Sequence, residues 1–325
     1  MIKVYLKHPL APALLSELRK QLHDQVDLVT AEQKPGLTDY DILVDGAPSR
    51  DDLIGCPRLR VLVVPWAGAP IETLELMHQF PDIAVHSLHY NPGPTAEMAM
   101  ALLLAAAKWV VPFDRRFRRH LWSPPFPGTG NGILLAGKTA LIVGYGRVGR
   151  RIGNACRGLG MKVIAIRRTV DRNAPEYVFP LSELSRLLSM ANVLLICVPH
   201  TAATEGLIGG AELERLPRDA ILVNVARGLI VDEAALYEAL KQRRLFGAGL
   251  DVWYQYPSAD EREADSPVPP SRFPFHALDN VVMMPHRAGW SEETESLRIE
   301  HLAQVLNAAA RGEAIPGRVD PIHDY

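Results

Sequence analysis

Cysteine is scarce in this sequence, with only Cys56, Cys156 and Cys197 in a chain of 325 residues. The three stand singly, so neither a disulfide framework nor a zinc site is indicated. A basic leader followed by an apolar segment is also missing from the N-terminus, where residues 1–6 have the pattern of a first strand. We therefore expect no metal, no export signal and a reducing, cytoplasmic environment.

Charge of one sign and long apolar runs are missing as well. The 35 basic and 37 acidic residues give a formal net charge of -2, which favours neither nucleic acid nor an anionic membrane as a partner. The most apolar run, residues 96–107, is too short to cross a bilayer. It is typical of a helix buried between protein layers.

Short β-rich runs alternate with helical patterns through the chain, which predicts parallel strands joined by crossover helices. A first series occupies residues 4–6, 42–44, 61–64 and 83–85. After a loop rich in Pro and Gly at 123–132, a second series occupies 139–143, 162–166, 193–198, 221–225, 249–252 and 281–284. Six such strands match a complete dinucleotide-binding sheet. Residues 257–274 indicate an irregular excursion, and 292–311 indicate a final helix.

The motif Gly144-Tyr145-Gly146-Arg147-Val148-Gly149 directly follows the apolar run 140–143 and opens a helix expected to end near Gly158. Glycines at these positions permit a tight turn and a close approach to a pyrophosphate, and the helix N-terminus offers unpaired N–H groups. The alternative is a merely glycine-rich turn. The strand before it and the helix after it favour the phosphate loop.

The end of the next strand bears on the choice of nicotinamide cofactor. An acidic residue there would bind the ribose 2′-hydroxyl, whereas arginine suits a 2′-phosphate. Here the strand runs into Arg167 and Arg168, and the first acidic residue is Asp171. We expect NADP(H) to be preferred, with NAD(H) still possible if the two arginines only flank an adenine pocket.

The chain resembles the D-isomer-specific 2-hydroxyacid dehydrogenases over nearly its whole length. The resemblance rests on several spaced motifs in order: Leu135-Ala136-Gly137-Lys138-Thr139, the glycine loop, Val223-Asn224-Val225-Ala226-Arg227-Gly228 with Val231-Asp232-Glu233, Gly249-Leu250-Asp251-Val252, and Pro285-His286-Arg287-Ala288-Gly289. It implies an oxidoreductase that reduces a small 2-keto acid to the D-2-hydroxy acid.

The resemblance also implies roles for two residues. Arg227 would bind the substrate carboxylate and polarise the reacting carbonyl, for which a planar, permanently charged fork is suited. His286 would exchange a proton with the carbonyl oxygen, because imidazole titrates near working pH. A surface ion pair is the alternative for Arg227.

Further positions are assigned less directly by the same resemblance. Asp251 corresponds to a residue that contacts the nicotinamide carboxamide, and Thr95 to one near the cofactor phosphates. The cofactor would also contact the neighbours of these motifs, namely Val198, Pro199, His200, Ala226 and Gly289. The substrate would approach Trp66, Ala67, Gly68 and Asn91, although plain loop packing is the alternative for Trp66 and Gly68.

One departure from the family pattern concerns the partner of the histidine. The family usually places a glutamate just before the proline that follows the Asp-Val motif, and Tyr256 stands there instead. Gln255 is one residue away, and formate dehydrogenases of this family use a glutamine. Tyr256, Gln255, or a carboxylate of the excursion (Asp260, Glu261 or Glu263) are therefore the candidate partners of His286. A neutral partner predicts that keto-acid reduction declines at a lower pH.

The expected architecture is α/β with two Rossmann-like domains. A doubly wound cofactor domain, residues 96–292, would be inserted into a smaller flavodoxin-like substrate domain, residues 1–95 and 293–325. A homodimer through the cofactor domain is expected from the resemblance. Two other functions stay open: oxidation of an unusual, formate-like hydride donor, and a cofactor-binding regulator without turnover.

Overall fold

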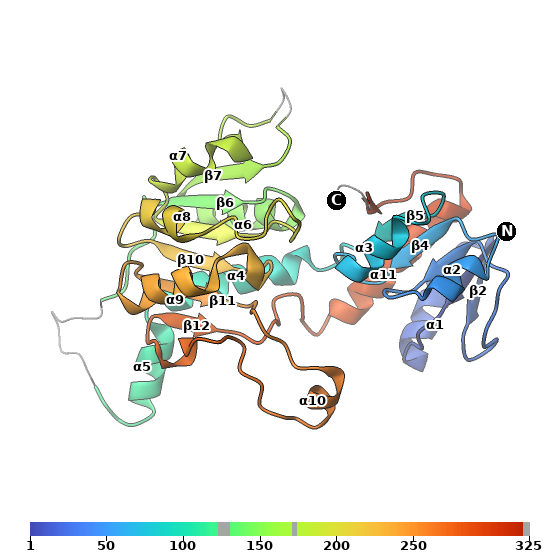
Figure 1. Cartoon of the computed structure of the whole chain (residues 1–325), viewed down its shortest axis with the longest axis horizontal. Helices are drawn as coiled ribbons and strands as arrows, with labels where there is room; N and C mark the ends of the chain where they lie inside the picture. The colour runs from blue at the N-terminus through green and yellow to red at the C-terminus, as the bar shows by residue number, and fades with distance from the viewer. Residues whose placement is uncertain (123–130, 171–173, 321–325) are drawn as a thin grey trace. The chain divides into compact units, whose positions relative to one another are not determined.

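The structure, a computed structural model, describes residues 1–122, 131–170 and 174–320 (Figure 1). The chain divides into two compact units. Unit 1 comprises Met1–Asn91 and Trp290–Tyr325, and unit 2 comprises Pro92–Gly289. Unit 2 is therefore inserted in the sequence of unit 1. Most of the loop expected at 123–132, and Asp171, lie outside the described residues.

Unit 1 is built on a six-stranded sheet in the order β13-β5-β4-β3-β1-β2. Its first five strands are parallel and follow the flavodoxin-like order 2-1-3-4-5, while β13 pairs antiparallel with β5. The strands are β1 (Ile2–Leu6), β2 (Val26–Thr30), β3 (Ile42–Val44), β4 (Val61–Val64), β5 (Ala84–Ser87) and β13 (Arg318–Val319). The helices are α1 (Pro12–Gln21), α2 (Arg50–Ile54), α3 (Ile71–Met77) and α11 (Thr294–Ala310), the last packed on α1.

Unit 2 contains a seven-stranded, fully parallel sheet in the order β12-β11-β10-β9-β6-β7-β8. The direction of winding reverses between β6 and β9, as in a doubly wound dinucleotide fold. The strands are β6 (Thr139–Val143), β7 (Lys162–Arg167), β8 (Val178–Pro180), β9 (Val193–Ile196), β10 (Ile221–Asn224), β11 (Gly247–Leu250) and β12 (Val281–Met283). The helices are α4 (Pro92–Ala107), α5 (Val110–Phe117), α6 (Arg147–Gly158), α7 (Leu184–Leu188), α8 (Gly210–Arg215), α9 (Glu233–Lys241) and α10 (Ala259–Glu263).

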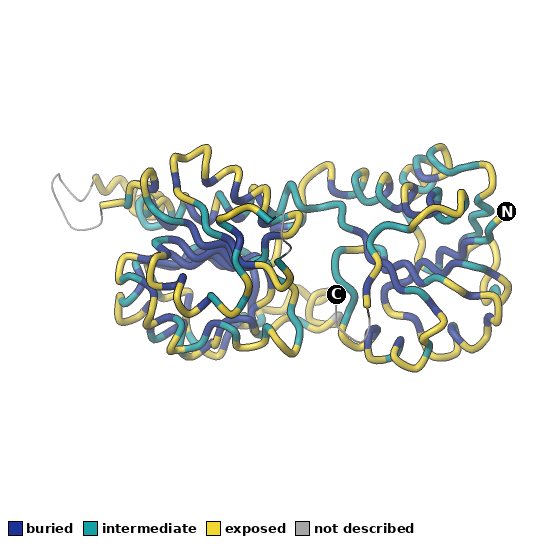
Figure 2. Tube along the Cα trace, turned by 90° about the horizontal axis from the view of Figure 1, so that it is seen from above, coloured by how far each residue is buried: buried dark blue, intermediate teal, exposed yellow. Residues whose placement is uncertain are grey.

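The core of unit 2 lies on both faces of this sheet, because each strand sends alternate side chains to opposite sides. In β6, Leu141 and Val143 enter one apolar cluster, whereas Ala140 and Ile142 enter the other. All four are fully buried. Figure 2 shows these central strands as buried segments surrounded by exposed loops and helices. The sheet is thus a rigid platform whose carboxyl edge carries the site residues.

One face of helix α4 is buried within unit 2, whereas Glu97, Ala101 and Leu104 are exposed, so the helix is less enclosed than its apolar sequence predicts. It packs against β10, β11 and α6, and a Cβ at Gly249 of β11 would lie only 2.7 Å from the Cβ of Leu102. Among the described residues, no single helix has the length and apolar character to cross a membrane. Together α4 and α5 meet the length and composition criteria, but they are bent by 65°.

The fold class expected from the sequence is confirmed. The sequence did not reveal three strands, β2, β8 and β13. The excursion at 257–274 was expected to be irregular throughout, but it contains the short helix α10, which Ser258 begins with a capping box. Figure 1 shows α10 on a long loop between β11 and β12.

Candidate active site

The glycine loop joins β6 to α6 with the geometry expected of a phosphate-binding turn. Gly144 has a φ of +102°, and a Cβ there would lie 2.6 Å from the carbonyl oxygen of Cys197. A Cβ at Gly149 would lie 2.0 Å from the carbonyl oxygen of Gly144. Only glycine fits at these two positions. At Gly146, by contrast, a Cβ would have no described atom within 4 Å.

The N-terminus of α6 is open to a ligand. No side chain caps it, and its first turn, which contains Arg147 and Val148, has no acidic residue. Its N–H groups and the positive end of the helix dipole suit a pyrophosphate. These residues therefore fit the dinucleotide cofactor that the sequence predicts.

The neighbouring strand ends adjoin this loop. The backbone N–H groups of Gly144 and Tyr145 donate to the carbonyl oxygen of Ile166, at 3.0 and 3.1 Å. Arg167 and Arg168 follow and are exposed. On the other side, the backbone at Val198 lies against Gly144. Pro199 and His200 come next, and His200 Nε2 lies 3.3 Å from a carboxylate oxygen of Glu205.

Arg227 follows β10 in a turn organised by a buried asparagine. Asn224 is 2% exposed; its amide donates to the carbonyl of Arg227 at 2.9 Å, and its side-chain oxygen accepts from the N–H of Ala226 at 3.0 Å. The Arg227 guanidinium donates to the carbonyl of Ala226 at 2.7 Å and is exposed. The next residue, Gly228, packs so closely that a Cβ would lie 2.3 Å from the carbonyl oxygen of Trp253. This turn therefore holds the arginine at a fixed place on the edge of the sheet.

His286 lies in a turn after β12 that a buried carboxylate holds in place. Its φ of 56° is in the left-handed region, which is unfavourable for histidine. Asp251, completely buried at the end of β11, accepts hydrogen bonds from the N–H groups of Arg287 and Ala288, both at 2.8 Å. These bonds to a charged acceptor offset the strain of the turn. Both oxygens of Asp251 thus have a contact within the protein, besides the cofactor contact that the sequence predicts.

Trp253 connects the arginine turn with the histidine turn. Its indole N–H donates to the carbonyl of Met284 at 2.8 Å, two residues before His286. The backbone of Trp253 lies against Gly228, and its backbone N–H donates to the hydroxyl of Tyr256 at 3.0 Å. The side chain is 5% exposed. Trp253 therefore fixes the spacing between the two turns.

Of the candidate partners of His286, Tyr256 is the one that contacts it. The ring centroids lie 5.5 Å apart at an interplanar angle of 55°. The contact between Tyr256 and His286 is therefore a packing of rings. Separately, the Tyr256 hydroxyl accepts a hydrogen bond from the backbone N–H of Trp253.

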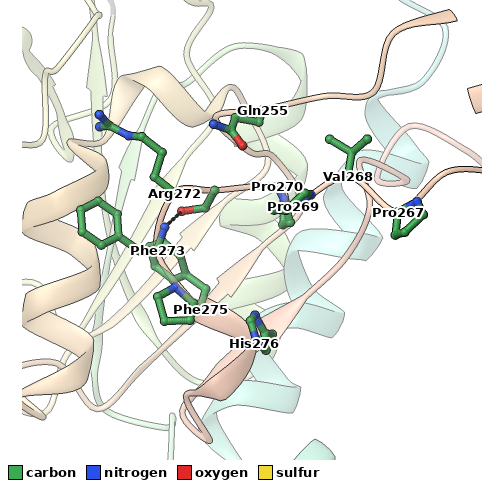
Figure 3. Close-up of a pocket in the computed structure, with 11 residues that line it drawn as sticks. Gln255, Pro267, Val268, Pro269, Pro270, Arg272, Phe273, Phe275 and His276 are labelled. Carbon is green, nitrogen blue, oxygen red and sulfur yellow. Dashed lines mark hydrogen bonds between the residues drawn. The ribbon is translucent and has the colours of Figure 1, made fainter. Parts of the chain in front are cut away.

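Gln255 faces elsewhere. Its N–H donates to the carbonyl of Pro270 at 3.0 Å, and it lines a cavity of about 610 Å³ formed by residues 267–276 (Figure 3). Glu261 caps α10, where its carboxylate accepts from the N–H of Ser258 at 2.8 Å. Within the described residues, no hydrogen bond joins His286 to Gln255, Asp260, Glu261 or Glu263.

The electrostatics of this site follow from these contacts. The pKa of His286 is lowered, mainly because the surrounding protein removes water from the imidazole and also because of the positive charge of Arg227; Asp251 opposes the shift. Burial raises the pKa of Tyr256, and Arg227 partly opposes this. Burial also raises the pKa of Asp251, against its two backbone hydrogen bonds. A cation, an imidazole and a phenol thus act on one another at this edge.

The remaining candidates lie apart from this cluster in the chain. Trp66, Ala67 and Gly68 follow β4, and Asn91 follows β5, both at the carboxyl end of the unit 1 sheet. The Trp66 ring lies against Gly46, where a Cβ would overlap it. In unit 2, Thr95 lies in the first turn of α4, and Gly289 is the last residue of the unit.

Sequence reasoning missed the residues that support the site. Asn224 belongs to a motif in which the sequence assigns it no role, and the sequence gives no role to Trp253 either. A polar residue at the end of an otherwise apolar strand, as in Val223-Asn224-Val225, is a signal that could have identified Asn224. The contact of Trp253 with Met284 spans 31 residues and has no local signal.

Comparisons with known proteins identify the family of this chain. The family profile described as "D-isomer specific 2-hydroxyacid dehydrogenase, NAD binding domain" matches residues 100–288. The chain is 40% identical to a glyoxylate reductase of Korarchaeum cryptofilum over 232 residues, which are 70% of this chain but 65% of that protein. The chain thus spans less than two thirds of that relative. It is 31% identical to a glycerate dehydrogenase of Methylorubrum extorquens over 281 residues, 83% of this chain and 82% of that protein.

A solved structure shares the complete fold. The D-isomer specific 2-hydroxyacid dehydrogenase from Xanthobacter autotrophicus, in complex with NADPH and MES, covers 100% of both chains at 24% identity with a TM-score of 0.81. This likeness extends over both units, including the segments outside the matched profile.

Proposed function

Because this chain belongs to the D-isomer-specific 2-hydroxyacid dehydrogenase family, we propose that it reduces a small 2-keto acid to the D-2-hydroxy acid with a nicotinamide cofactor. The observation that carries the proposal is the placement of Arg227 and His286 on one edge of the unit 2 sheet, close enough for the arginine to lower the pKa of the histidine. A fixed cation and a titratable imidazole are the two groups that carbonyl reduction requires.

In this reaction Arg227 and His286 have separate tasks. Arg227 binds the substrate carboxylate and polarises the carbonyl oxygen, and its turn is fixed by Asn224. His286 donates a proton to that oxygen, and Asp251 holds its turn. Gly144, Gly146 and Gly149 would hold the cofactor, which when bound would supply the hydride for the reduction. The substrate-side residues are Trp66, Ala67, Gly68 and Asn91.

We propose NADPH as the preferred cofactor, with NADH as a poorer substitute. Arg167 ends β7 at the position where a carboxylate would bind the ribose of NAD, and Arg168 follows it. Two guanidinium groups favour a phosphate dianion, and no acidic residue stands between them and Asp171, which lies outside the described residues.

The test is NADPH oxidation with a panel of glyoxylate, hydroxypyruvate and pyruvate, repeated with NADH. We expect turnover with at least one acid, and a loss of about 100- to 10,000-fold in His286→Asn, the range for removing a general acid. Arg227→Lys should lose about 100-fold or more, because a lysine cannot replace the fork. Activity in the panel that survives both substitutions would contradict the proposal.

The formate-like alternative stays open, because its motive is the missing family glutamate, and Tyr256 stands at that position. Gln255, the residue that could replace the glutamate, lines a separate cavity. Oxidation of formate with no activity on keto acids would favour this alternative, whereas cofactor binding without any turnover would favour a regulator.

We also propose that unit 2 forms a homodimer in the cytoplasm. Several large apolar side chains are exposed on α4, α5 and the residues after them, namely Leu104, Val110, Phe117, Leu121 and Trp122. Such a patch is typical of a protein contact. Light scattering after size-exclusion chromatography should give twice the chain mass of 35.9 kDa, and Phe117→Glu should give the monomer.

A further inference from the structure

Tyr256 adjoins the two groups to which the proposed reaction assigns the chemistry. Its ring packs against the imidazole of His286, with the centroids 5.5 Å apart at an interplanar angle of 55°. The positive charge of Arg227 acts on the phenol as it acts on the imidazole. Tyr256 is 45% exposed, so its side chain is open to a ligand. The phenol is therefore a third polar group at this edge of the sheet.

The oxygen of the Tyr256 hydroxyl is held in place by the backbone of its own turn. It accepts the backbone N–H of Trp253 at 3.0 Å, so the side chain closes the turn formed by residues 253–256. Trp253 is itself fixed by its indole hydrogen bond to Met284, at 2.8 Å, and by its close packing on Gly228. The phenol oxygen thus has a fixed place relative to the arginine turn and the histidine turn. A donor fixed in advance needs no reorganisation when charge develops on a substrate.

The hydrogen of this hydroxyl remains available. A tyrosine hydroxyl has one O–H donor besides its acceptor lone pairs, and the bond from Trp253 uses only an acceptor. Within residues 1–122, 131–170 and 174–320, the Tyr256 hydroxyl donates to no protein group. Burial raises the pKa of Tyr256, although the N–H of Trp253 and the charge of Arg227 oppose the shift. The phenol therefore keeps its proton throughout the neutral range.

Tyr254, two residues earlier, shows what a structural tyrosine does in the same turn. Its hydroxyl donates to the carbonyl of Val231 at 2.9 Å, and burial raises its pKa strongly. The hydrogen of Tyr254 is thus used inside the protein, whereas that of Tyr256 is not. The two residues provide a matched comparison between a hydroxyl that stabilises the fold and one that is open to a ligand.

We propose that Tyr256 is a further catalytic residue, whose hydroxyl donates a hydrogen bond to the carbonyl oxygen of the 2-keto acid. The inference rests on the proposed function, in which Arg227 and His286 act on that same oxygen, and adds an uncharged donor beside them. During reduction the carbonyl carbon accepts a hydride from the reduced nicotinamide, the C=O electron pair moves to the oxygen, and the oxygen takes the proton of His286. Tyr256 keeps its own proton and stabilises the negative charge that develops on the oxygen.

This role differs from that of a partner of the histidine. A carboxylate at position 256 would act through His286, because its charge would stabilise the imidazolium. A neutral phenol whose ring packs against the imidazole supplies no such charge. A donor to the substrate changes kcat across the whole pH range, whereas a partner of His286 changes the pH at which activity falls.

The test is Tyr256→Phe, which removes the hydroxyl and keeps the ring. With saturating NADPH and the keto acid that the panel identifies, we expect kcat to fall about 100-fold, the lower end of the range for losing one donor to a developing oxyanion. KM should change by less than about threefold, because the interaction strengthens in the transition state. The falling limb of the kcat/KM profile should stay within about half a pH unit of wild type, since neither side chain is charged.

Two measurements accompany the kinetics. Oxamate, an unreactive analogue of a 2-keto acid, reports the ground-state affinity directly by calorimetry with NADPH present, and it should bind Tyr256→Phe within about threefold of wild type. Tyr254→Phe is the matched control, because it removes the same hydroxyl from a bond to Val231. It should lower the melting temperature but leave kcat within about twofold.

Three results would overturn the proposal. A kcat for Tyr256→Phe within about twofold of wild type, or no lower than that of Tyr254→Phe, would show that the hydroxyl is not catalytic. A raised KM and weaker oxamate binding at unchanged kcat would make it a ground-state contact. A limb displaced by about one pH unit or more would make it a partner of His286. Failure of the proposed function is seen separately, because the wild-type chain would then reduce no acid of the panel and both proposals would be wrong.

Discussion

The two halves of the unit 2 sheet position their site residues in different ways. On the half formed by β6, β7 and β9, the glycine loop lies between one strand and the following helix, and its motif spans six consecutive residues, although Gly144 also packs against Cys197 after β9. On the half formed by β10, β11 and β12, Arg227 and His286 depend on contacts between segments far apart in sequence. Asp251 reaches Arg287 across 36 residues, and Trp253 reaches Met284 across 31.

Because of this difference, we expect substitutions in one half to reduce cofactor binding and substitutions in the other half to reduce proton transfer. A substitution that distorts the glycine loop removes cofactor affinity, whereas one that releases the His286 turn removes proton transfer and leaves the loop intact. The effects are measurable as changes in the dissociation constant of NADPH on one side and in kcat on the other.

The largest effect is expected from Asp251→Ala. Two backbone N–H groups, of Arg287 and Ala288, would lose a charged acceptor, and His286 would no longer be held at its φ of 56°. We expect kcat to fall about 100- to 1,000-fold, because misplacement of a catalytic group by about 1 Å costs about 100-fold. The free energy of unfolding should fall by about 2–4 kcal/mol for the two lost bonds. Steady-state kinetics and urea unfolding measure both.

Asp251→Asn is the control for this variant, since it keeps one oxygen acceptor and should retain part of the activity. Fluorescence titration with NADPH distinguishes the positioning role from the cofactor contact. A large rise in the dissociation constant with an unchanged kcat would show that Asp251 acts on the cofactor and not on the His286 turn.

Gly144→Ala tests the half of the sheet formed by β6, β7 and β9, where the glycine loop would hold the cofactor. The new methyl would lie 2.6 Å from the carbonyl oxygen of Cys197, at a φ of +102°. We expect a loss of about 1–3 kcal/mol in the free energy of unfolding from overpacking and a rise of about tenfold or more in the dissociation constant of NADPH. At saturating cofactor, kcat should stay within about threefold. Gly146→Ala, with no described atom within 4 Å of its Cβ, should be tolerated for folding and affect only cofactor binding. Equal destabilisation by both would contradict the geometry of the loop.

The same contrast explains how much could be predicted from the sequence. The strand–glycine loop–helix signal is local, and α6 ends at Gly158 as expected. The apolar helix α4 and the fold class were likewise predictable, because alternating elements and apolar periodicity determine them. The short edge strand β8 was missed because its three residues, Val178–Pro180, contain a proline and carry little pattern.

The candidate site could be predicted only in part from the sequence. Motifs and the family resemblance gave Arg227 and His286, whose roles remain predictions. The sequence leaves open whether Tyr256, Gln255 or a carboxylate of the excursion is the partner of His286, because the answer depends on how the backbone turns after β11. In the structure, the N–H groups of Tyr254 and Gln255 both donate to Pro270, which directs Gln255 into the cavity of Figure 3 and leaves Tyr256 beside His286. No sequence pattern predicts the hydrogen bonds of Tyr254 and Gln255 with Pro270.

Tyr256→Glu tests the half of the sheet that carries His286 through the pH dependence of the activity. Reduction requires the protonated imidazole, so activity falls as the pH rises through the pKa of His286, which is lowered in this chain by desolvation and by Arg227. A carboxylate at position 256 would stabilise the imidazolium and raise that pKa. We expect the falling limb of the kcat/KM profile to move about one unit or more to higher pH. Tyr256→Gln, which is neutral, should leave the limb near its wild-type position. Coincident limbs in the two variants would mean that the side chain at 256 does not face the imidazole.

Trp253→Phe tests the link between the arginine and histidine turns and should have the smallest effect. It removes the hydrogen bond from the indole N–H to Met284 but keeps an aromatic ring in the core and leaves the backbone contact with Gly228 unchanged. We expect a loss of about 1–2 kcal/mol in the free energy of unfolding and a fall of a few-fold in kcat, with the NADPH dissociation constant unaffected. If Trp253→Phe weakened NADPH binding as strongly as it lowered kcat, the two halves of the sheet would be coupled through this residue. The conclusion that cofactor binding and proton transfer are affected by different substitutions would then be wrong.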